Sequence, residues 1–265
     1  MDLHLRDQVV IITGGAKGIG RAIALAFAAE GAIPCIVGRS PAEADALVAT
    51  IAAAGGSAAA FPCELTEPTA IAAAVENIVA RFGRIDVLVH NAGVNDGVGL
   101  DAGIAAFRTS LERNLVHVYE LTRLCLPQLT AAKGAIVNIG SKCSITGQGG
   151  TNGYAAAKGA MNSLTREWGV ELAPRGIRVN CVLPAEVMTP QYAHWISSRP
   201  DPDAALAAIR ATIPLGQRMT TAEEIADTVV FVASPRSSHT TGQLLYVDGG
   251  YIHFDRAVTH PGASA

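Results

Sequence analysis

The sequence predicts a doubly wound α/β fold, in which helices cover both faces of a seven-stranded parallel sheet. Short runs rich in valine and isoleucine alternate along the chain with longer alanine-rich stretches of helical period. The apolar runs are continuous rather than alternating, which is typical of parallel strands buried on both faces. Because strands and helices alternate strictly, the doubly wound arrangement is favoured.

The elements follow from the local composition, taken in chain order. Valine and isoleucine favour strands, whereas alanine and leucine favour helices. We expect strands at Val9–Thr13, Ala32–Val37, Ala58–Pro62, Val87–His90, Ala135–Ile139, Arg178–Val182 and Leu244–Val247. We expect helices around Gly20–Glu30, Ala42–Ala54, Thr69–Phe82, Leu111–Leu129, Tyr154–Ala173 and Ala222–Ala233.

One segment breaks this rhythm. Residues 188–213 carry Pro190, Pro200 and Pro202 together with Trp195 and several polar side chains. An excursion of this length inside a compact α/β domain is typical of a lid or a binding element. Neither a repeat nor a Ser/Pro-rich linker divides the chain. We therefore expect one domain over residues 1–265, with a substrate lid at about residues 188–213.

Composition and charge narrow the class of protein. The 265 residues are 49% hydrophobic and 16% charged, which argues against disorder and is enough for one well-buried α/β domain or at most two small ones. Lysine and arginine number 20 against 23 aspartates and glutamates, a net charge of −3. This balance predicts no broad surface for nucleic acid or for an anionic membrane.

Cysteine and histidine usage predicts a protein without disulfides or a metal. The five cysteines are odd in number and form no CxxC motif, and the seven histidines are not spaced like zinc ligands. No apolar run approaches the roughly 18 residues of a membrane helix. The first residues also lack the basic-then-apolar build of a signal peptide. We expect a soluble, cytoplasmic protein.

A glycine-rich turn follows the first strand, reading Thr13-Gly14-Gly15-Ala16-Lys17-Gly18-Ile19-Gly20. Gly14, Gly18 and Gly20 permit a tight turn, close approach of a ligand and close packing of the next helix, whose first N–H groups can face a pyrophosphate. Such a turn can also serve backbone geometry alone. Its place between the first strand and the first helix favours a dinucleotide-binding Rossmann domain.

The end of the second strand indicates which dinucleotide is bound. A cofactor without a 2′-phosphate requires a carboxylate there for the ribose, but this chain has Gly38 and Arg39. Arg39 can bind a phosphate bidentately, and Lys17 adds a second positive charge. The alternative is two solvated surface cations. We expect NADP, with NAD as a possible cofactor.

Three further residues form a candidate catalytic set. Ser141 follows the fifth expected strand, and Tyr154 and Lys158 share one helical face at i and i+4. A cation about 5 Å from a phenol, at an effective dielectric of about 20, lowers its pKa by about two units. Tyr154 could then transfer a proton while Ser141 holds the reacting oxygen. Taken one at a time, the spacing of Tyr154 and Lys158 could arise by chance, and Ser141 could be an ordinary turn or cap serine.

Together these motifs resemble the short-chain dehydrogenase/reductase family from about Leu5 to Tyr251. The matching pieces also include Asn91-Ala92-Gly93, Asn114, the Pro184…Thr189 turn and Asp248-Gly249-Gly250. Two positions depart from the usual family pattern, because His90 replaces an asparagine and Ala185 replaces a glycine. The change at His90 is expected to be structural, and Ala185 is expected to stiffen the loop beside the nicotinamide.

The resemblance implies roles for individual residues. Asn114 would hold a water that links Lys158 to solvent, Glu64 would lie near the adenine, and Thr189 would hold the nicotinamide carboxamide. It also implies a homotetramer whose subunits meet through the helices at Leu111–Leu129 and Tyr154–Ala173. Cofactor contacts are expected at Gly14, Lys17, Gly18, Ile19, Gly20, Arg39, Glu64, Leu65, Asn91, Ala92, Gly93, Tyr154, Lys158, Pro184, Val187 and Thr189.

The residues expected to line the substrate side are polar, and Lys142, directly after Ser141, is among them. Those that we assign to the substrate are Asn95, Gln148, Glu186, Gln191 and Trp195. Such a set suits a polyhydroxylated ligand, whereas a steroid or an acyl chain would need an apolar wall. Alternatively, some of them face solvent, and Glu186 pairs with a nearby cation such as Arg218.

Three segments resemble the L-fucose-oxidising branch of the family: residues 91–103, 184–192 and 234–242. That resemblance implies oxidation of the C1 hydroxyl of an aldose to the lactone with reduction of NAD(P)+. The alternatives are an NADPH-dependent carbonyl or 3-oxoacyl reductase, and a non-catalytic NADP sensor. A sensor would be expected to lack Tyr154 or Lys158, and both are present.

Overall fold

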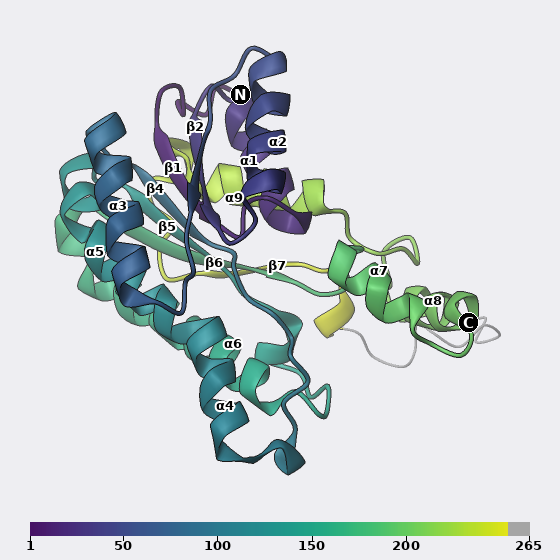
Figure 1. Ribbon diagram of the computed structural model, residues 1–265. Coiled ribbons are helices and arrows are strands. Elements are labelled where there is room, and N and C mark those ends of the chain that lie inside the picture. The colour runs from purple at the N-terminus through teal and green to yellow at the C-terminus, as the bar shows by residue number, and fades with distance from the viewer. Residues whose placement is uncertain (254–265) are drawn as a thin grey trace.

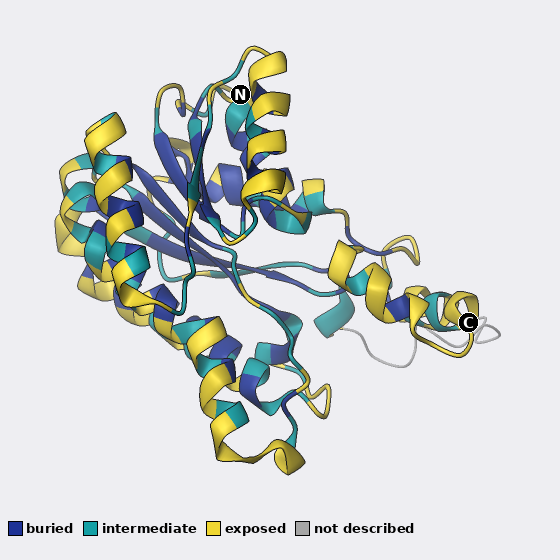
Figure 2. Ribbon diagram, in the orientation of Figure 1, coloured by how far each residue is buried: buried dark blue, intermediate teal, exposed yellow. Residues whose placement is uncertain are grey.

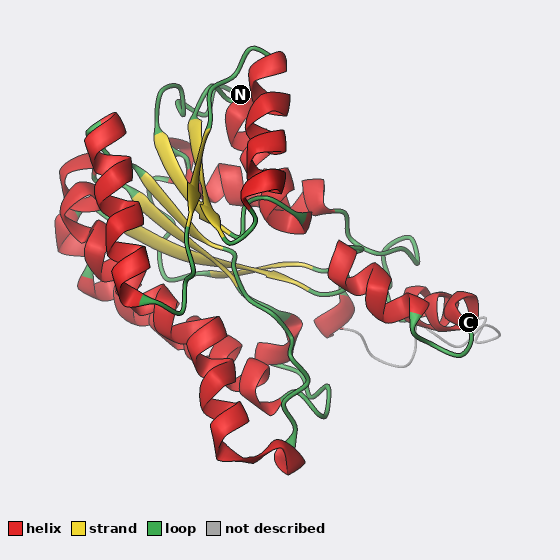
Figure 3. Cartoon of the chain, viewed as in Figure 1, coloured by secondary structure: helices red, strands yellow, loops and turns green. Residues whose placement is uncertain are grey.

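Seven parallel strands form one sheet in the order β3-β2-β1-β4-β5-β6-β7, with helices on both faces (Figures 1 and 3). The computed structural model describes residues 1–253. The strands are β1 Val9–Thr13, β2 Ile33–Gly38, β3 Ala59–Pro62, β4 Val87–His90, β5 Ala135–Ile139, β6 Arg178–Pro184 and β7 Leu244–Val247. The predicted fold class and all seven predicted strands are confirmed, with ends that differ by at most two residues.

The strand order reverses direction between β1 and β4. In the sheet, β1 pairs with β2 on one side and with β4 on the other, so that Ile11 lies opposite both Cys35 and Leu88. Every residue of β1, β4 and β5 is buried, which explains their continuous apolar sequences. The loops after β1 and β4 leave the sheet in opposite directions at this switch point, and ligands of doubly wound folds bind at such a point, at the carboxyl ends of the strands.

The helices alternate with the strands. They are α1 Gly18–Ala29, α2 Pro41–Ala53, α3 Pro68–Phe82, α4 Gly103–Leu111, α5 His117–Ala132, α6 Asn152–Glu171, α7 Pro190–Ser197, α8 Pro202–Ala211 and α9 Ala222–Ala233. Shorter helical turns are η1 Leu100–Ala102, η2 Glu112–Val116, η3 Lys142–Ser144, η4 Ala173–Arg175, η5 Pro235–Ser237 and η6 Tyr251–His253.

Two hydrophobic cores lie on opposite faces of the sheet (Figure 2). On one face, Ile12 and Val89 pack with residues of α1, α2 and α9. On the other face, Ile11 and Leu88 pack with residues of α3, α5 and α6. Alternate residues of a strand point to opposite faces, so each strand supplies both cores. All five cysteines are buried, and they are free as predicted; Cys35, Cys63 and Cys125 belong to the second core.

The helix predicted at Leu111–Leu129 is wrong in its extent. Helical structure begins at Gly103, passes through the π-helical turn η2 and ends at Ala132. A π-helical turn adds one residue to the repeat and interrupts the 3.6-residue period from which the start was read. The interruption places Asn114 on the buried side of this long helical segment.

The structure places two helices, α7 and α8, in the segment predicted as a lid. No helix in this segment was among those expected, and Pro190 and Pro202 occupy first helical positions, where proline is favoured. Thr189 and Asp201 cap these helices through their side-chain oxygens. In Figure 1, α7 and α8 project beyond the carboxyl ends of β6 and β7. Closure of this segment over a substrate stays a prediction.

Two negative findings concern the described part of the chain. Within residues 1–253, no helix combines the length and apolar composition needed to cross a membrane. The same described residues contain no group of three or more histidine, cysteine, aspartate or glutamate side chains that could hold a metal ion.

Candidate active site

The glycine-rich turn packs too closely for larger residues. Gly14 and Gly18 have φ of 62° and 51°, a conformation that favours glycine. A Cβ atom on Gly20 would lie 2.5 Å from Asn91 Nδ2 and closer still to the Gly14 carbonyl oxygen. No side chain caps the first N–H groups of α1, which are free to bind an anion. The turn therefore fits the pyrophosphate of a dinucleotide.

Asn91 and Thr13 hold this turn against the end of β4. Asn91 Nδ2 donates to the backbone oxygens of Thr13 and Gly14, at 2.9 and 3.2 Å. Thr13 Oγ1 accepts from the backbone N–H groups of Asn91 and Ala92, both at 3.0 Å. The predicted cofactor residues Asn91 and Ala92 are thus adjacent to the glycine turn. Sequence reasoning missed Thr13, although it directly precedes Gly14.

The two cations expected near the adenosine end each contact a carboxylate. Arg39 Nη1 lies 3.5 Å from Glu64 Oε2, and the Arg39 side chain is 73% exposed. Glu64 Oε1 accepts from the backbone and the hydroxyl of Thr66, which fixes the carboxylate at the loop after β3. Lys17 Nζ lies 2.5 Å from Glu43 Oε1 of α2. Both cations flank the carboxyl end of β2, at its Gly38 terminus, and both side chains are reachable from solvent.

The candidate catalytic residues come together where β5 ends and α6 begins. Ser141 directly precedes η3, and its hydroxyl accepts from the backbone N–H of Cys143 at 3.2 Å. Lys158 Nζ lies 5.7 Å from the centre of the Tyr154 ring and donates to the Ile139 carbonyl at 2.7 Å. Ser141, Tyr154 and Lys158 are thus neighbours, and Ser141 also has the cap role that we considered.

We expected the pKa of Tyr154 to be lowered, and for the groups of the protein by themselves this expectation is wrong. Burial raises the pKa of Tyr154 to about 12, although a hydrogen bond from Ser141 acts to lower it. Burial also lowers the pKa of Lys158 to about 8. Sequence reasoning counted the charge of Lys158 but not the desolvation of both groups, which opposes ionisation of either. The positive charge of an oxidised nicotinamide would favour the phenolate.

Comparisons with known proteins indicate the family of the chain over most of its length. A family model described as Enoyl-(Acyl carrier protein) reductase matches residues 14–252. The chain is 35% identical to the 3-oxoacyl-[acyl-carrier-protein] reductase FabG of Thermotoga maritima, covering 94% of this chain and all of that protein. It is 34% identical to the L-fucose dehydrogenase of Bos taurus, covering 97% and 94%.

A solved structure is similar as well. The crystal structure of Cj0485 dehydrogenase superposes with a TM-score of 0.93 at 45% identity, covering 98% of this chain and all of that one. The chain belongs to the short-chain dehydrogenase/reductase family. It is therefore an NAD(P)-dependent oxidoreductase, in agreement with the glycine turn that fits a pyrophosphate.

As a short-chain dehydrogenase/reductase, the chain was expected to use Asn114 in a water relay. Asn114 is fully buried in η2, and its Oδ1 accepts from the Val94 N–H at 2.7 Å while Nδ2 donates to the Ser110 carbonyl at 2.9 Å. A Cβ atom on Gly93 would lie 3.0 Å from Asn114 Oδ1 and 3.5 Å from Lys158 Nζ. Asn114 is therefore close to Lys158 across Gly93, and the water relay stays a prediction.

The loop after β6 carries further residues of the expected cofactor site. Val187 is buried and bridges to Thr220, and Thr189 begins α7. A Cβ atom on Gly18 would lie 3.4 Å from Thr189 Cγ2, so this loop contacts the glycine turn. Pro184 ends β6 beside Val247 of β7. The remaining predicted cofactor residues Ile19 and Leu65 pack against the two cores.

Glu186 pairs with Lys142, and not with Arg218 as we considered. The Lys142 ammonium contacts Glu186 Oε1, and the two side chains are only 12% and 10% exposed. Arg218 is bound instead by Glu224, at 2.5 Å. The alternative that Glu186 pairs with a nearby cation is thus confirmed, but with another cation, because Arg218 lies just before α9, where the capping carboxylate of Glu224 binds it.

The other predicted substrate residues lie in the turn after Ser141, in the loop after β4 and on α7. Gln148 Oε1 accepts from the Cys143 thiol in the turn after Ser141. Gln191 Nε2 lies 3.5 Å from the Asn95 carbonyl oxygen, so the loop after β4 approaches α7. Trp195 packs edge-on against Tyr192, with ring centres 5.3 Å apart, and Arg199 lies over its ring. The structure thus brings Asn95 close to Gln191, and places Trp195 on the outer part of α7.

Three residues surround Glu186; the sequence placed one of them, Lys142, on the expected substrate side and gave the other two no role. The three residues are Lys142, Tyr192 and Tyr251, in η3, α7 and η6. Lys142 Nζ lies 4.2 Å from the centre of the Tyr251 ring, and Glu186 raises the pKa of Tyr192 further after burial has raised it. The available signals were the position of Lys142 directly after Ser141 and of Tyr251 directly after Asp248-Gly249-Gly250.

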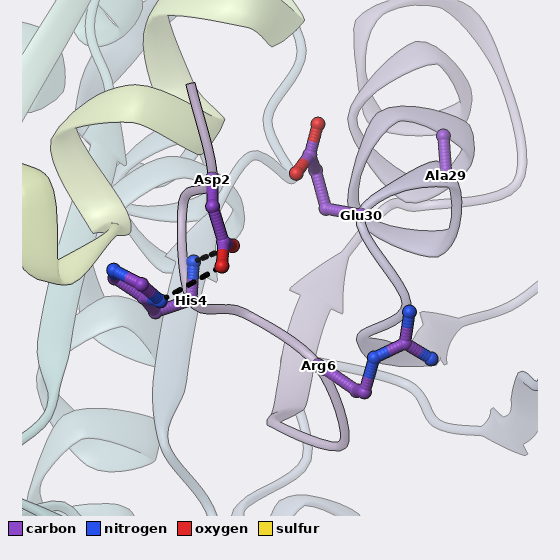
Figure 4. A pocket seen from close by; sticks show the side chains of 5 residues that line it. All are labelled: Asp2, His4, Arg6, Ala29 and Glu30. Carbon is purple, nitrogen blue, oxygen red and sulfur yellow. Dashed lines mark hydrogen bonds and ion pairs between the residues drawn. The ribbon is translucent and has the colours of Figure 1, made fainter.

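A surface hollow lies far from these groups. It is lined by Asp2, His4, Arg6, Ala29 and Glu30, and Figure 4 shows His4 bonded to Asp2. These residues directly precede β1 and β2, so the hollow is at the amino ends of the strands. Ligands of this fold bind at the carboxyl ends, and we assign the hollow no part in the active site.

Proposed function

We propose that this enzyme oxidises the C1 hydroxyl of an aldose, L-fucose or a similar sugar, to the lactone with NADP+. The observation that carries the proposal is the polar, largely buried Lys142–Glu186 pair beside Ser141. Such a surface suits hydroxyl groups and not an acyl chain. Similarity to the L-fucose dehydrogenase of Bos taurus supports the same substrate class.

The chain's own residues divide the chemistry between them. Tyr154 takes the proton of the reacting hydroxyl, Ser141 donates a hydrogen bond to the same oxygen, and Lys158 orients and polarises the site. A bound nicotinamide supplies the hydride acceptor. Asn114 holds a water through which the proton leaves from Lys158. Asn95, Gln148, Glu186, Gln191 and Trp195 contact the sugar.

NADP is proposed over NAD on the charges at the end of β2. Arg39 is exposed there and Gly38 offers no carboxylate to the ribose. In this proposal Arg39 and Lys17 turn from Glu64 and Glu43 to the 2′-phosphate, which carries about −1.5 to −2 charges. Both ion pairs are solvent-exposed, and exposed pairs contribute little to stability, so exchanging them costs little.

A second candidate is NADPH-dependent reduction of a carbonyl or 3-oxoacyl group. It is favoured by the 35% identity to the Thermotoga maritima reductase and by the description of the matching family model. An acyl substrate would require an apolar wall beside Tyr154, where the structure has the Lys142–Glu186 pair.

One assay separates the two candidates. Formation of reduced cofactor is measured with NADP+ and NAD+ across aldoses, polyols and secondary alcohols, and consumption of NADPH is measured with a 3-oxoacyl thioester. We expect the highest kcat/KM with L-fucose or an aldose of the same hydroxyl pattern, and with NADP+. Faster turnover of the thioester than of every sugar would refute the proposal in favour of the reductase.

A further inference from the structure

An ion pair stands between the catalytic serine and the helix α7. Lys142 follows Ser141 at the end of β5, and Glu186 lies two residues after β6, the neighbouring strand. Tyr192 of α7 and Tyr251 of η6 flank the pair. Four segments that are separate in the sequence thus converge at the carboxyl edge of the sheet, next to the group that is to hold the reacting oxygen.

Holding the fold together is a poor explanation for this pair. Removing two charges from water costs more than their attraction usually returns, and well-packed apolar residues would be at least as stabilising. Both side chains are nearly nine-tenths buried, whereas the described ion pairs Lys17–Glu43 and Arg218–Glu224 are about half exposed. A buried pair at an active site can instead offer its unused donors and acceptors to a ligand.

Both partners keep hydrogen-bonding capacity. The ammonium of Lys142 has three N–H donors. One donates to Glu186 and a second faces the Tyr251 ring. Burial acts to lower the pKa of Lys142, but Glu186 and Tyr251 hold it above its usual value, so the ammonium stays charged. The carboxylate has two oxygens with about four acceptor sites, of which Lys142 takes one and the Tyr192 hydroxyl another, so acceptor capacity remains. One donor and one acceptor therefore lie side by side.

We propose that Lys142 and Glu186 form a clamp for two neighbouring hydroxyl groups of the substrate. Lys142 donates to the oxygen of one hydroxyl, and Glu186 accepts from the next. The pair has no net charge, so it selects neutral polyols over sugar acids and over monohydroxy alcohols. This inference rests on the proposed sugar oxidation, and it assigns a specificity-determining role to Lys142.

The test uses binding, because turnover also depends on Tyr154. Methyl β-L-fucopyranoside has no free C1 hydroxyl and is not oxidised, so its dissociation constant with the enzyme–NADPH complex is measured by calorimetry. Lys142→Met removes the donor and is expected to weaken binding by on the order of 10- to 100-fold. Arg84→Met is the control. It removes the cation of the Arg84–Asp86 pair, which lies at the amino ends of the strands, and is expected to leave binding of the glycoside unchanged.

Deoxy analogues identify the clamped hydroxyls. The 2-, 3- and 4-deoxy glycosides are compared in the wild type, in Lys142→Met and in Glu186→Gln. We expect two neighbouring positions at which loss of the hydroxyl weakens binding to the wild type. The analogue that lacks the first of these hydroxyls is expected to bind Lys142→Met as tightly as it binds the wild type, because the interaction with Lys142 is already missing. The analogue that lacks the second is expected to bind Glu186→Gln as tightly as it binds the wild type, for the same reason. If Lys142→Met does not fold, the Glu186→Gln series carries the test.

The outcomes are distinguishable. Equal loss of affinity for all glycosides in Lys142→Met, or no binding of any glycoside to the wild type, overturns the clamp. Deoxy analogues that bind the wild type as tightly as the parent glycoside also overturn it. Binding with the expected pattern, but without oxidation of L-fucose, supports the clamp and refutes the proposed function.

Discussion

At the residue scale, the pKa values of Tyr154 and Lys158 show how burial works against ionisation. The phenol is shifted up to about 12 and the ammonium down to about 8, and in both cases desolvation is the largest cause. A proton acceptor for a hydroxyl must be a phenolate. The positive charge of an oxidised nicotinamide cofactor would favour that phenolate.

Tyr154→Phe tests the acid/base role. Only the phenolic oxygen is lost, so binding of NADPH is expected to stay as in the wild type while kcat falls by about 10²- to 10⁴-fold. Cofactor binding is followed by fluorescence titration and turnover by steady-state kinetics. Retention of more than about a tenth of kcat would assign the proton transfer to another group.

Arg39→Ala tests cofactor choice. Arg39 is 73% exposed and contacts Glu64 alone in the described part of the chain, so its removal is expected to leave the fold intact. The KM for NADP+ is expected to rise by at least about tenfold, since one charge-assisted hydrogen bond is worth about 1.5–3 kcal/mol, with little change for NAD+. Equal changes for both cofactors would make Arg39 a surface residue without a role in selection.

Lys158→Met tests the pKa shift of Lys158. Burial lowers the pKa of Lys158 in the folded chain to about 8, below the 10.5 of an ordinary lysine, which applies to the unfolded chain. Between these values the unfolded state binds more protons, so the free energy of unfolding increases with pH. The wild type is expected to gain about 3 kcal/mol relative to Lys158→Met across this window, measured by urea unfolding. A constant difference would show an unshifted lysine.

At the element scale, the β1–α1 turn depends on the absence of a side chain at Gly20. Gly20→Ala would place a methyl group against Asn91 and the Gly14 carbonyl. We expect a loss of more than about 2 kcal/mol in stability together with weaker cofactor binding. The matched control is Gly38→Ala, whose Cβ would meet Gly14 at an ordinary 3.8 Å. An equal decrease in the unfolding temperature of Gly20→Ala and Gly38→Ala would contradict this account.

At the scale of the whole molecule, apolar side chains remain exposed on the helices predicted to join subunits. Tyr119 of α5 is 57% exposed and Val170 of α6 is 78% exposed. Exposed apolar surface of this kind marks interaction sites when it is contiguous. We expect a homotetramer by light scattering, and a smaller species for Tyr119→Glu. A monomer at assay concentrations would refute the predicted assembly.

The sequence predicted the sheet well because each strand is buried on both faces and so must be continuously apolar. It also predicted the neighbourhood of Tyr154 and Lys158, since residues four apart share a helical face. Prediction failed where the period was interrupted, as at the π-helical turn before α5, and at residues 190–211, where two helices that begin at prolines were not among those expected.

By itself, the sequence determined the layers, the glycine turn and the spacing of Ser141, Tyr154 and Lys158, because these depend on local composition and short separations. Only the tertiary structure decided which charges meet. Lys142 and Glu186 are 44 residues apart in sequence and meet because β5 and β6 are neighbours whose loops leave the same edge of the sheet. Arg218 is held by Glu224 instead, since the cap of α9 lies nearer. Desolvation, which sets the pKa values of Tyr154 and Lys158, likewise arises only when distant segments pack around them.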